Sequence, residues 1–401
     1  MAPVTSTDDP AALKARARGR IDAARGRLIA LSRAIHAAPE LAFDEHRAAR
    51  LTGELLAAEG FAVEHGAGGL DTAFRATFGD GDLTVGLCAE YDALPGLGHA
   101  CGHNVIAAAS VGAALGLTDV ADDLGIRVAV IGTPAEEQGG GKIRLLERGV
   151  FDAVTVAMMV HPEAFEVHPA DVATPAVARF AATYTGRPAH ASAAPHEAVN
   201  AADAAVVAQV AVGLLRQQLT GDSRIGLFVR EGGEATNIIP ARTVVACEVR
   251  AATTDALDDL RRRVTACFEA GALATGAQLT IEQTQPPYAA LEPDPTLARS
   301  YAANATALGR APAERGTRTV GSTDMGDVTR ALPGIHPMIA IRGAENHPHT
   351  AGFAADAVSP AAEDTIVDGA LALAFTGIDI ALDPEARGRF LDRHRARTGR
   401  A

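Results

Sequence analysis

The sequence is poor in aromatic residues and contains no tryptophan. Aromatic side chains make up 4% of the 401 residues, whereas apolar side chains make up 48%. The core must therefore be built from alanine, valine, leucine and isoleucine, and the apolar content is that of a globular chain, not a disordered one. A chain of this length is too long for one simple core, so we expect two domains, or one domain with a large insertion.

Cysteine and positive charge are also scarce. Four cysteines in so long a chain do not form a disulfide framework, so we expect a reducing, cytoplasmic compartment. Cys88, Cys247 and Cys267 lie in apolar surroundings and are expected to be ordinary buried thiols. The formal net charge of −13 argues against nucleic acid or an anionic membrane surface as the main partner.

The N-terminal region lacks an uninterrupted apolar run. Its first ten residues are polar and residues 11–37 have the pattern of a charged amphipathic helix, so we expect neither a signal peptide nor a membrane span. Residues 72–78 and 83–88 flank the turn Gly79-Asp80-Gly81, which predicts a hairpin. Further along, strands alternate with helices and end in polar residues, which is typical of an α/β sheet with its site along one edge.

The pattern changes at Ala178. From there to Gln283 the predicted order is strand, helix, strand, strand, helix, strand, which is the ferredoxin-like βαββαβ arrangement. We therefore expect an α/β domain formed by residues 1–177 and 292–401, with residues 178–291 inserted as a second domain.

A cluster of metal-ligand residues lies in the stretch Gly86–Asn104. His99, Cys101 and His103 fall close together in a Gly-rich turn that follows an apolar strand-like run. A thiolate and neutral imidazoles are ligands for a transition metal, and the neighbouring glycines let the backbone bend so that they can converge. The pattern predicts a metal site whose other ligands lie elsewhere in the chain.

An acidic pair provides the next candidates. Glu136 and Glu137 stand between an apolar strand and the run Gly139–Gly141; taken alone, such a pair is more often a solvated loop. Neighbouring acids on a turn point in different directions, however, so one can bind a metal while the other holds a water.

Histidines at the ends of later strands are more ambiguous. His161 follows an apolar strand and is as readily a strand-end residue as a ligand. His347 and His349 pose the same choice, and because Pro348 disfavours a regular strand we expect only one of them to reach the site. His190, after the first strand of the inserted segment, is either a surface-loop residue or one that reaches across a cleft.

Three alternative interpretations apply to these residues. The run Gly139–Lys142 is not a phosphate-binding P-loop, which needs glycine where Glu136 stands and serine or threonine where Ile143 stands. Cys101 beside His103 could act as a nucleophile, but this leaves the glutamate pair and the later histidines without a role. A non-catalytic metal-binding protein is a third alternative, although it has no need of a second acid beside the metal.

Several stretches, in a fixed order, carry a resemblance to a known family. They read AEYDALPGLGHACGHN, GTPAEEQGGGKIRLLERGVFD, GRPAHASAAPHEAVNAADA, TNIIPARTVVACEVRA, GSTDMGDV and HPHTAGF. They resemble the M20 family of metallopeptidases and amidohydrolases, most closely the branch with a cysteine in the metal motif. Within this branch, the sequence stretches are most similar to those of the M20 domain-containing protein 2 group of dipeptidases and of aminobenzoyl-glutamate hydrolases. The resemblance runs from about His36 to Phe353.

The resemblance implies a site for two divalent metal ions. Cys101 would bridge the two ions. His103 and Glu137 would complete one side, and His161 and His349 would serve the other. Zinc is the expected metal, and manganese and cobalt are the next alternatives.

The resemblance also implies roles around the metals. Glu136 would be the general base, and Asp92 would orient a metal ligand. His190 would help to hold the scissile carbonyl, while Asn237 and Arg250 would contact the carboxylate end of the substrate.

One residue departs from the wider family pattern. Many M20 enzymes have a histidine ligand where this chain has Glu90, so we expect Glu90 to lie outside the metal's ligand shell. The fold implied is a mixed-sheet metallo-exopeptidase domain whose inserted domain acts as a lid and dimerises the protein. The expected activity is metal-dependent hydrolysis of the amide bond of a dipeptide, an N-acyl amino acid or aminobenzoyl-glutamate.

Overall fold

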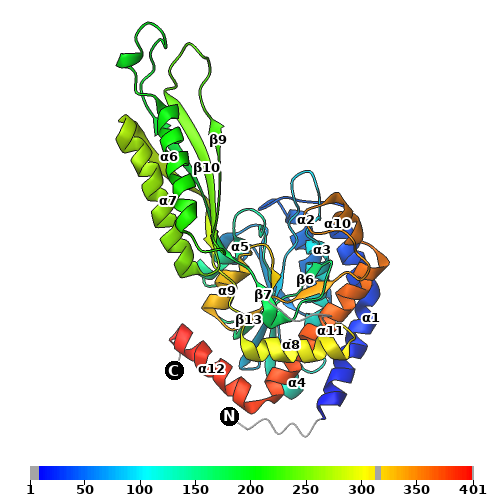
Figure 1. The fold of residues 1–401 in the computed structure, drawn as a ribbon. Helices are drawn as coiled ribbons and strands as arrows, with labels where there is room; N and C mark the ends of the chain where they lie inside the picture. The colour runs from blue at the N-terminus through cyan, green and yellow to red at the C-terminus, as the bar shows by residue number, and fades with distance from the viewer. Residues whose placement is uncertain (1–8, 312–317, 400–401) are drawn as a thin grey trace. The chain divides into compact units, whose positions relative to one another are not determined.

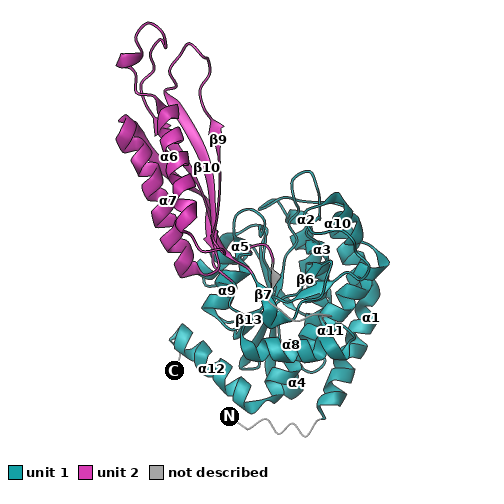
Figure 2. Cartoon of the chain, in the orientation of Figure 1, with its two compact units in different colours: residues 1–173, 291–319, 323–401 teal, residues 174–290, 320–322 magenta. Residues whose placement is uncertain are grey.

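The computed structural model describes residues 9–311 and 318–399 and divides the chain into two compact units. Unit 1 contains the chain up to residue 173, residues 291–319 and residues 323–401, and unit 2 contains residues 174–290 and 320–322 (Figure 2). Unit 2 is thus an insertion in unit 1, and its main segment lies close to residues 178–291, where the sequence predicted an inserted domain.

Unit 1 is built on a six-stranded mixed sheet. In spatial order its strands are β1 (Ala62–His65), β2 (Phe74–Phe78), β4 (Ile126–Gly132), β3 (Leu83–Ala89), β5 (Val156–Met158) and β13 (Gly334–Ile335). β2 pairs antiparallel with β1 and β4, whereas β3 pairs parallel with both β4 and β5. The expected α/β fold with a mixed sheet is confirmed.

The hairpin expected around Gly79-Asp80-Gly81 is wrong. β4 lies between the two strands that this turn joins, so β2 and β3 do not pair with each other. Every residue of β3 is buried, as in the centre of a sheet covered on both faces, where a strand pairs with parallel neighbours. The glycine turn connects the strands, but it does not determine which strands pair.

A buried helix packs on this sheet and is covered in turn by two others. α3 (His103–Thr118) is buried along almost its whole length, and it packs against α1 (Pro10–His36) and α11 (Pro360–Leu382). α1 and α11 lie side by side in Figure 1. Within the described chain, α11 is the one helix long and apolar enough to cross a membrane, but most of its apolar length is buried in unit 1, which is the burial of a core helix.

The chain after the insertion completes unit 1. β13 pairs with β5, and β14 (Met338–Ala340) pairs with β6 (His161–Glu163), both parallel. The remaining elements of unit 1 are α2 (His46–Ala58), α4 (Ala121–Leu124), α5 (Gly141–Glu147), β7 (Val172–Ala173), α8 (Pro295–Ala307), β12 (Arg318–Thr319), α9 (Met325–Ala331), α10 (Ala351–Asp356), α12 (Pro384–Thr398) and the 3-10 turns η1 (Ala67–Gly69) and η2 (Pro169–Asp171).

Unit 2 has the predicted βαββαβ order. Its elements are β8 (Ala176–Thr185), the 3-10 turn η3 (Pro195–Glu197), α6 (Ala201–Leu215), the 3-10 turn η4 (Arg216–Gln218), β9 (Arg224–Glu231), β10 (Arg242–Ala251), α7 (Thr254–Thr275) and β11 (Gln278–Tyr288). The strands form an antiparallel sheet in the order β11-β8-β10-β9, and α6 and α7 lie together on one side of it (Figure 1). Between sheet and helices, the Tyr184 hydroxyl donates a hydrogen bond to the Phe268 carbonyl at 2.8 Å.

Two of the three cysteines expected to be buried thiols are buried. Cys88 lies in β3 and Cys247 in β10, whereas Cys267 is half-buried. Cys267 lies on α7, one position before Phe268, which faces the core of unit 2. Successive positions of a helix point in different directions, so the apolar neighbours of Cys267 in the sequence do not bury it.

Candidate metal centre

The Cys/His turn begins where β3 ends and finishes at the start of α3. Gly102 has φ +77, and a β-carbon there would come within 2.6 Å of Pro162, so this position requires glycine. The turn places Cys101 Sγ 3.4 Å from His161 Nε2. The predicted convergence of thiol and imidazole is therefore achieved by pairing the turn with a residue from a strand sixty positions later.

Asp92 orients His103. The His103 Nδ1 lies 2.9 Å from the Asp92 carbonyl and 3.0 Å from its Oδ1, so Nδ1 carries the proton and donates it to Asp92. The unprotonated Nε2 is then available as a ligand atom. Burial opposes ionisation of Asp92, but His103, the Glu137 N–H and Lys142 together outweigh burial and lower the pKa of Asp92.

The acidic pair follows β4 and is tied to the same aspartate. The backbone N–H of Glu137 donates to Asp92 Oδ2 at 3.0 Å. His103 Nε2 lies 3.9 Å from Glu137 Oε1 and 4.0 Å from Glu136 Oε2. Asp92 thus joins the Cys/His turn to the glutamate loop, which is the orienting position that the resemblance implies for it.

His161 and His349 complete the cluster. His161 begins β6, and its Nδ1 donates to the Pro162 carbonyl at 2.9 Å, which leaves Nε2 on the side of Cys101. His349 lies 3.3 Å from Glu137 Oε1 through its Nε2, and its backbone N–H donates to the Ala100 carbonyl at 2.7 Å.

Of the two histidines in the NHPHTAG stretch, only one joins the cluster. His349 does so, whereas the His347 ring lies against Phe165. This agrees with the expectation that only one of the pair reaches the site. His99, from the Cys/His turn, is buried, but it belongs to none of the ligand groups found among the described residues.

Three overlapping groups of side chains could each hold a metal ion. In each group the ligand atoms lie within 4.8 Å of one another, and the groups are Cys101–His103–His161, Cys101–Glu137–His349 and His103–Glu136–Glu137. All five expected ligands and the expected base are therefore together, and Cys101 belongs to two groups, as a bridging ligand would. His103 is grouped once with His161 and once with Glu137, so the division of ligands between two ions stays a prediction.

The donor set fits a transition-metal ion. The buried Nε2 of His103 has no hydrogen-bond partner among the described residues, and a buried polar atom left without a partner is costly. Thiolate, imidazole and carboxylate together are ligands that zinc and its neighbours take. Burial, followed by the nearby Glu137, raises the pKa of Cys101, and a divalent ion would supply the positive charge that favours the thiolate.

Sequence reasoning missed a buried lysine beside this centre. The Lys142 ammonium, which is fully buried, donates to Glu90 and, at 2.6 Å, to Asp324. The other oxygen of Glu90 lies 3.5 Å from His103 Nε2. A lysine within a glycine run beside two glutamates was the available signal, but the sequence did not identify its partners.

His336 is a second buried residue that the sequence did not single out. Its ring centroid lies 5.4 Å from that of His161. Burial, followed by His161, lowers the pKa of His336 well below its ordinary value. The His336 ring is therefore neutral and packs beside the cluster.

The remaining predicted residues lie in unit 2. The Asn237 carbonyl accepts a hydrogen bond from the Ala191 N–H at 3.0 Å, so His190 and Asn237 are on adjacent segments. Arg250 is not with them. It pairs with Val177 near the start of β8, and its guanidinium donates to Glu248 at 2.7 Å and to Ser322 at 3.0 Å.

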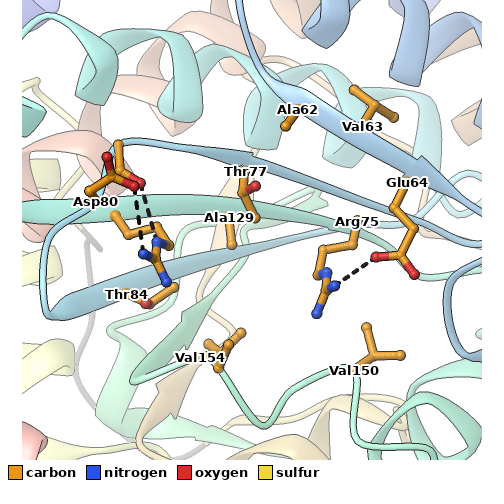
Figure 3. Close-up of a pocket in the computed structure, with 13 residues that line it drawn as sticks. Ala62, Val63, Glu64, Arg75, Thr77, Asp80, Thr84, Ala129, Val150 and Val154 are labelled. Carbon is orange, nitrogen blue, oxygen red and sulfur yellow. Dashed lines mark hydrogen bonds and ion pairs between the residues drawn. The ribbon is translucent and has the colours of Figure 1, made fainter.

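A separate pocket of about 430 Å³ lies against the sheet of unit 1. It includes Thr84 and Arg127 from the first halves of β3 and β4, whereas the candidate ligands follow the opposite ends of these strands. In Figure 3, Arg75 and Glu64 form an ion pair along this pocket. None of the predicted site residues lines the pocket.

Comparisons with known proteins identify the family. Residues 86–364 match the model of peptidase family M20/M25/M40. The chain is 41% identical over 395 residues to Xaa-Arg dipeptidase of Mus musculus, covering 93% of this chain and 90% of the relative. It is 30% identical over 282 residues to a p-aminobenzoyl-glutamate hydrolase chain of Escherichia coli, covering 65% of this chain and 58% of the relative.

Solved structures share the fold. A putative aminohydrolase from methicillin-resistant Staphylococcus aureus aligns with a TM-score of 0.75 at 22% identity and covers 91% of this chain and 99% of its own. A dinuclear metal-binding peptidase of the M20 family from Bacillus subtilis aligns with a TM-score of 0.65 at 22% identity, covering 88% and 98%. The site and the fold define a metal-dependent amidohydrolase. This chain belongs to peptidase family M20.

Proposed function

We propose that the protein is a dipeptidase that holds two divalent metal ions and cleaves dipeptides with a basic C-terminal residue. The observation that carries the two-ion site is that Cys101 is shared by two ligand groups, with Glu136 beside them. The substrate class is supported by the likeness to Xaa-Arg dipeptidase, which extends over nearly all of both chains. We propose zinc as the metal because thiolate and imidazole ligands favour it.

Glu136 is proposed as the general base. When bound, two divalent ions would lower the pKa of a water and polarise the amide carbonyl. Glu136 takes the proton of that water and delivers it to the leaving nitrogen. Burial, followed by the charge of Glu137, raises the pKa of Glu136, so its carboxylate is a stronger base than an exposed one.

His190 is proposed to donate a hydrogen bond to the oxygen on which charge develops during hydrolysis. Its Nδ1 accepts hydrogen bonds from the N–H groups of Ser192 and Ala193, at 3.3 and 3.2 Å. The proton of the neutral ring therefore resides on Nε2, which can act as a donor. Asn237, on the adjacent segment, is proposed to contact the carboxylate end of the substrate.

We also propose that unit 2 forms a homodimer. Val206, Val210 and Leu214 are 56%, 58% and 70% exposed on α6, and a spacing of four places them on one face of the helix. An exposed apolar row of this kind marks a protein contact. β9 lies at the edge of the unit 2 sheet, and within the described part of the chain no strand pairs with its outer side, which is open for pairing with another chain.

A substrate panel tests the proposed activity. Dipeptides ending in arginine or lysine, N-acyl amino acids and aminobenzoyl-glutamate are incubated with the protein before chelation, after chelation and after metal is restored. We expect cleavage of the basic dipeptides to stop on chelation and to return with metal. Preference for aminobenzoyl-glutamate would assign the second candidate activity, which the relative from Escherichia coli favours. Cleavage that survives chelation but not thiol alkylation would make Cys101 a nucleophile and refute the proposal.

The Glu136→Ala variant tests the general base. We expect it to keep its metal, measured by elemental analysis, and to lose about 10²- to 10⁴-fold in kcat. Wild-type turnover in this variant would remove Glu136 from the role.

A further inference from the structure

The loop that carries Glu136 begins with a strained residue. Ala135 has φ +61 and is one of three non-glycine residues with positive φ among those the structure describes; the others are Phe43 and His349. A β-carbon makes this left-handed conformation unfavourable, so it persists only where surrounding contacts impose it. Ala135 directly precedes the proposed base, and its backbone therefore helps to set where Glu136 points.

Glu45 supplies the contact that holds Ala135. The Ala135 N–H donates to Glu45 Oε1 at 2.8 Å, across 90 positions of sequence. Glu45 is fully buried and belongs to none of the metal-ligand groups found in the described chain.

The carboxylate of Glu45 does not cap its own helix, although it accepts hydrogen bonds from the backbone of Glu45 itself and from the Thr72 side chain. Glu45 occupies the N-cap position of α2, yet its side chain makes no capping bond there within the described structure. Glu40 does this instead, since its carboxylate accepts from the N–H groups of Arg47 and Ala48 at 2.9 and 2.8 Å. Acidic side chains are stabilising close to a helix N-terminus. Here the carboxylate of Glu45 faces the loop of the proposed base.

The residues around Glu45 contact the same loop a second time. Phe43 has φ +64, and its ring lies so close to Gly139 that a β-carbon there would be 2.4 Å from it. The Arg144 guanidinium lies 4.4 Å from the centre of the Phe43 ring. Residues 40–45, which we term the brace, therefore hold the glutamate loop at both ends.

The brace also reaches the loop that carries Asp92. The carbonyl of Glu40 accepts a hydrogen bond from the Ala93 N–H at 2.8 Å. The brace thus contacts the chain directly after Asp92 and directly before Glu136. Relative displacement of these two loops would move the base with respect to the metal ligands.

We propose that Glu45 is a positioning residue, which holds Ala135 in its left-handed conformation and so aims Glu136 at the attacking water. This inference rests on the proposed role of Glu136 as the base. Displacement of a catalytic group by about 1 Å can cost on the order of 10²-fold in rate, which sets the scale of the expected effect.

The test uses the full-length, metal-loaded protein and four variants. Glu45→Ala removes the acceptor and is expected to lower kcat roughly 10²-fold, with KM and bound metal close to wild type. Glu45→Gln keeps an acceptor oxygen and is expected to stay within a few-fold of wild type. Ala135→Gly alone should be near wild type. Added to Glu45→Ala, it should restore about tenfold, because glycine adopts positive φ without a β-carbon clash.

A second readout does not depend on activity. Hydrogen exchange of the peptide spanning residues 133–141 should be faster in Glu45→Ala than in wild type, because the Ala135 N–H has lost its acceptor. Wild-type kcat in Glu45→Ala would overturn the proposal, as would a loss of kcat that Ala135→Gly does not recover at full metal content. Wild-type turnover in Glu136→Ala would instead refute the role of the base, and the two failures are thereby distinguished.

Discussion

The buried ammonium of Lys142 allows a quantitative prediction about stability. Lys142 and its partners Glu90 and Asp324 are all 0% exposed. Burial opposes the charge of the lysine, but Asp324 and Glu90 outweigh it and raise the pKa of Lys142 well above its ordinary value. Replacement by methionine keeps the length of the side chain but leaves two buried carboxylates without their cation.

The expected cost is about 3–5 kcal/mol of unfolding free energy, which is typical when one partner of a buried ion pair is removed. The sequence offers a matched control, because its only other lysine is Lys14. Lys14 pairs with Asp379 at the same 2.6 Å, but the two side chains are 26% and 30% exposed. Lys14→Met should therefore cost no more than about 1 kcal/mol.

Urea unfolding of the metal-free proteins, followed by circular dichroism, measures both variants under identical conditions. Losses of equal size, or a loss below about 1 kcal/mol for Lys142→Met, would refute the reasoning from burial. A triple variant, Glu90→Gln with Lys142→Met and Asp324→Asn, removes all three charges together. It should recover most of the loss, because the cost comes from unpaired charge and much less from lost volume.

Three further predictions concern pH, metal content and assembly. Burial, followed by the charge of Asp92, raises the pKa of Glu45 from 4.5 to about 7, so ionisation of Glu45 destabilises the wild-type fold increasingly as pH rises from 4.5 to 7. The unfolding free energy of metal-free Glu45→Gln, measured in urea, should therefore rise by about 2–3 kcal/mol relative to that of wild type between pH 5 and pH 8. A difference between the two proteins that does not change with pH would contradict this. Cys101→Ala should lose more metal than His161→Ala by elemental analysis, because Cys101 belongs to two ligand groups; equal losses would argue against a bridge. Val210→Glu should convert a dimer into a monomer in light scattering, and an unchanged mass would place the contact elsewhere.

Local patterns predicted the elements well but not every strand pairing. The βαββαβ order of unit 2 was predictable because each strand and helix carries its own periodicity and the segment is continuous. The hairpin between β2 and β3 was not a correct inference, because the strand that lies between them, β4, comes some forty residues later. Pairing between distant strands depends on burial in the whole sheet, which the turn sequence does not encode.

The sequence likewise predicted only some residues of the candidate site. The spacing of His99, Cys101 and His103 predicted a cluster of ligands, but it did not separate Cys101 and His103, which join the ligand groups, from His99, which does not. The roles of Lys142 and Glu45 were not predictable, since each acts through partners far away in the sequence. The glycines and glutamates beside Lys142 do not identify its partners, and Glu45 has no local signature of burial. The ambiguity of His161 was resolved only by its distance of 3.4 Å from Cys101.

The position of the insertion fixes the order in which the two units can be completed during synthesis. The sheet of unit 2 ends at Tyr288, before β13 and β14 have been made. Unit 1 needs these two strands to pair with β5 and β6, and it needs His349 to finish the ligand cluster. During synthesis, all four strands of the unit 2 sheet are therefore made while β5 and β6 of unit 1 still lack their partners β13 and β14. Stable capture of metal would therefore follow the synthesis of the whole of the unit 2 sheet.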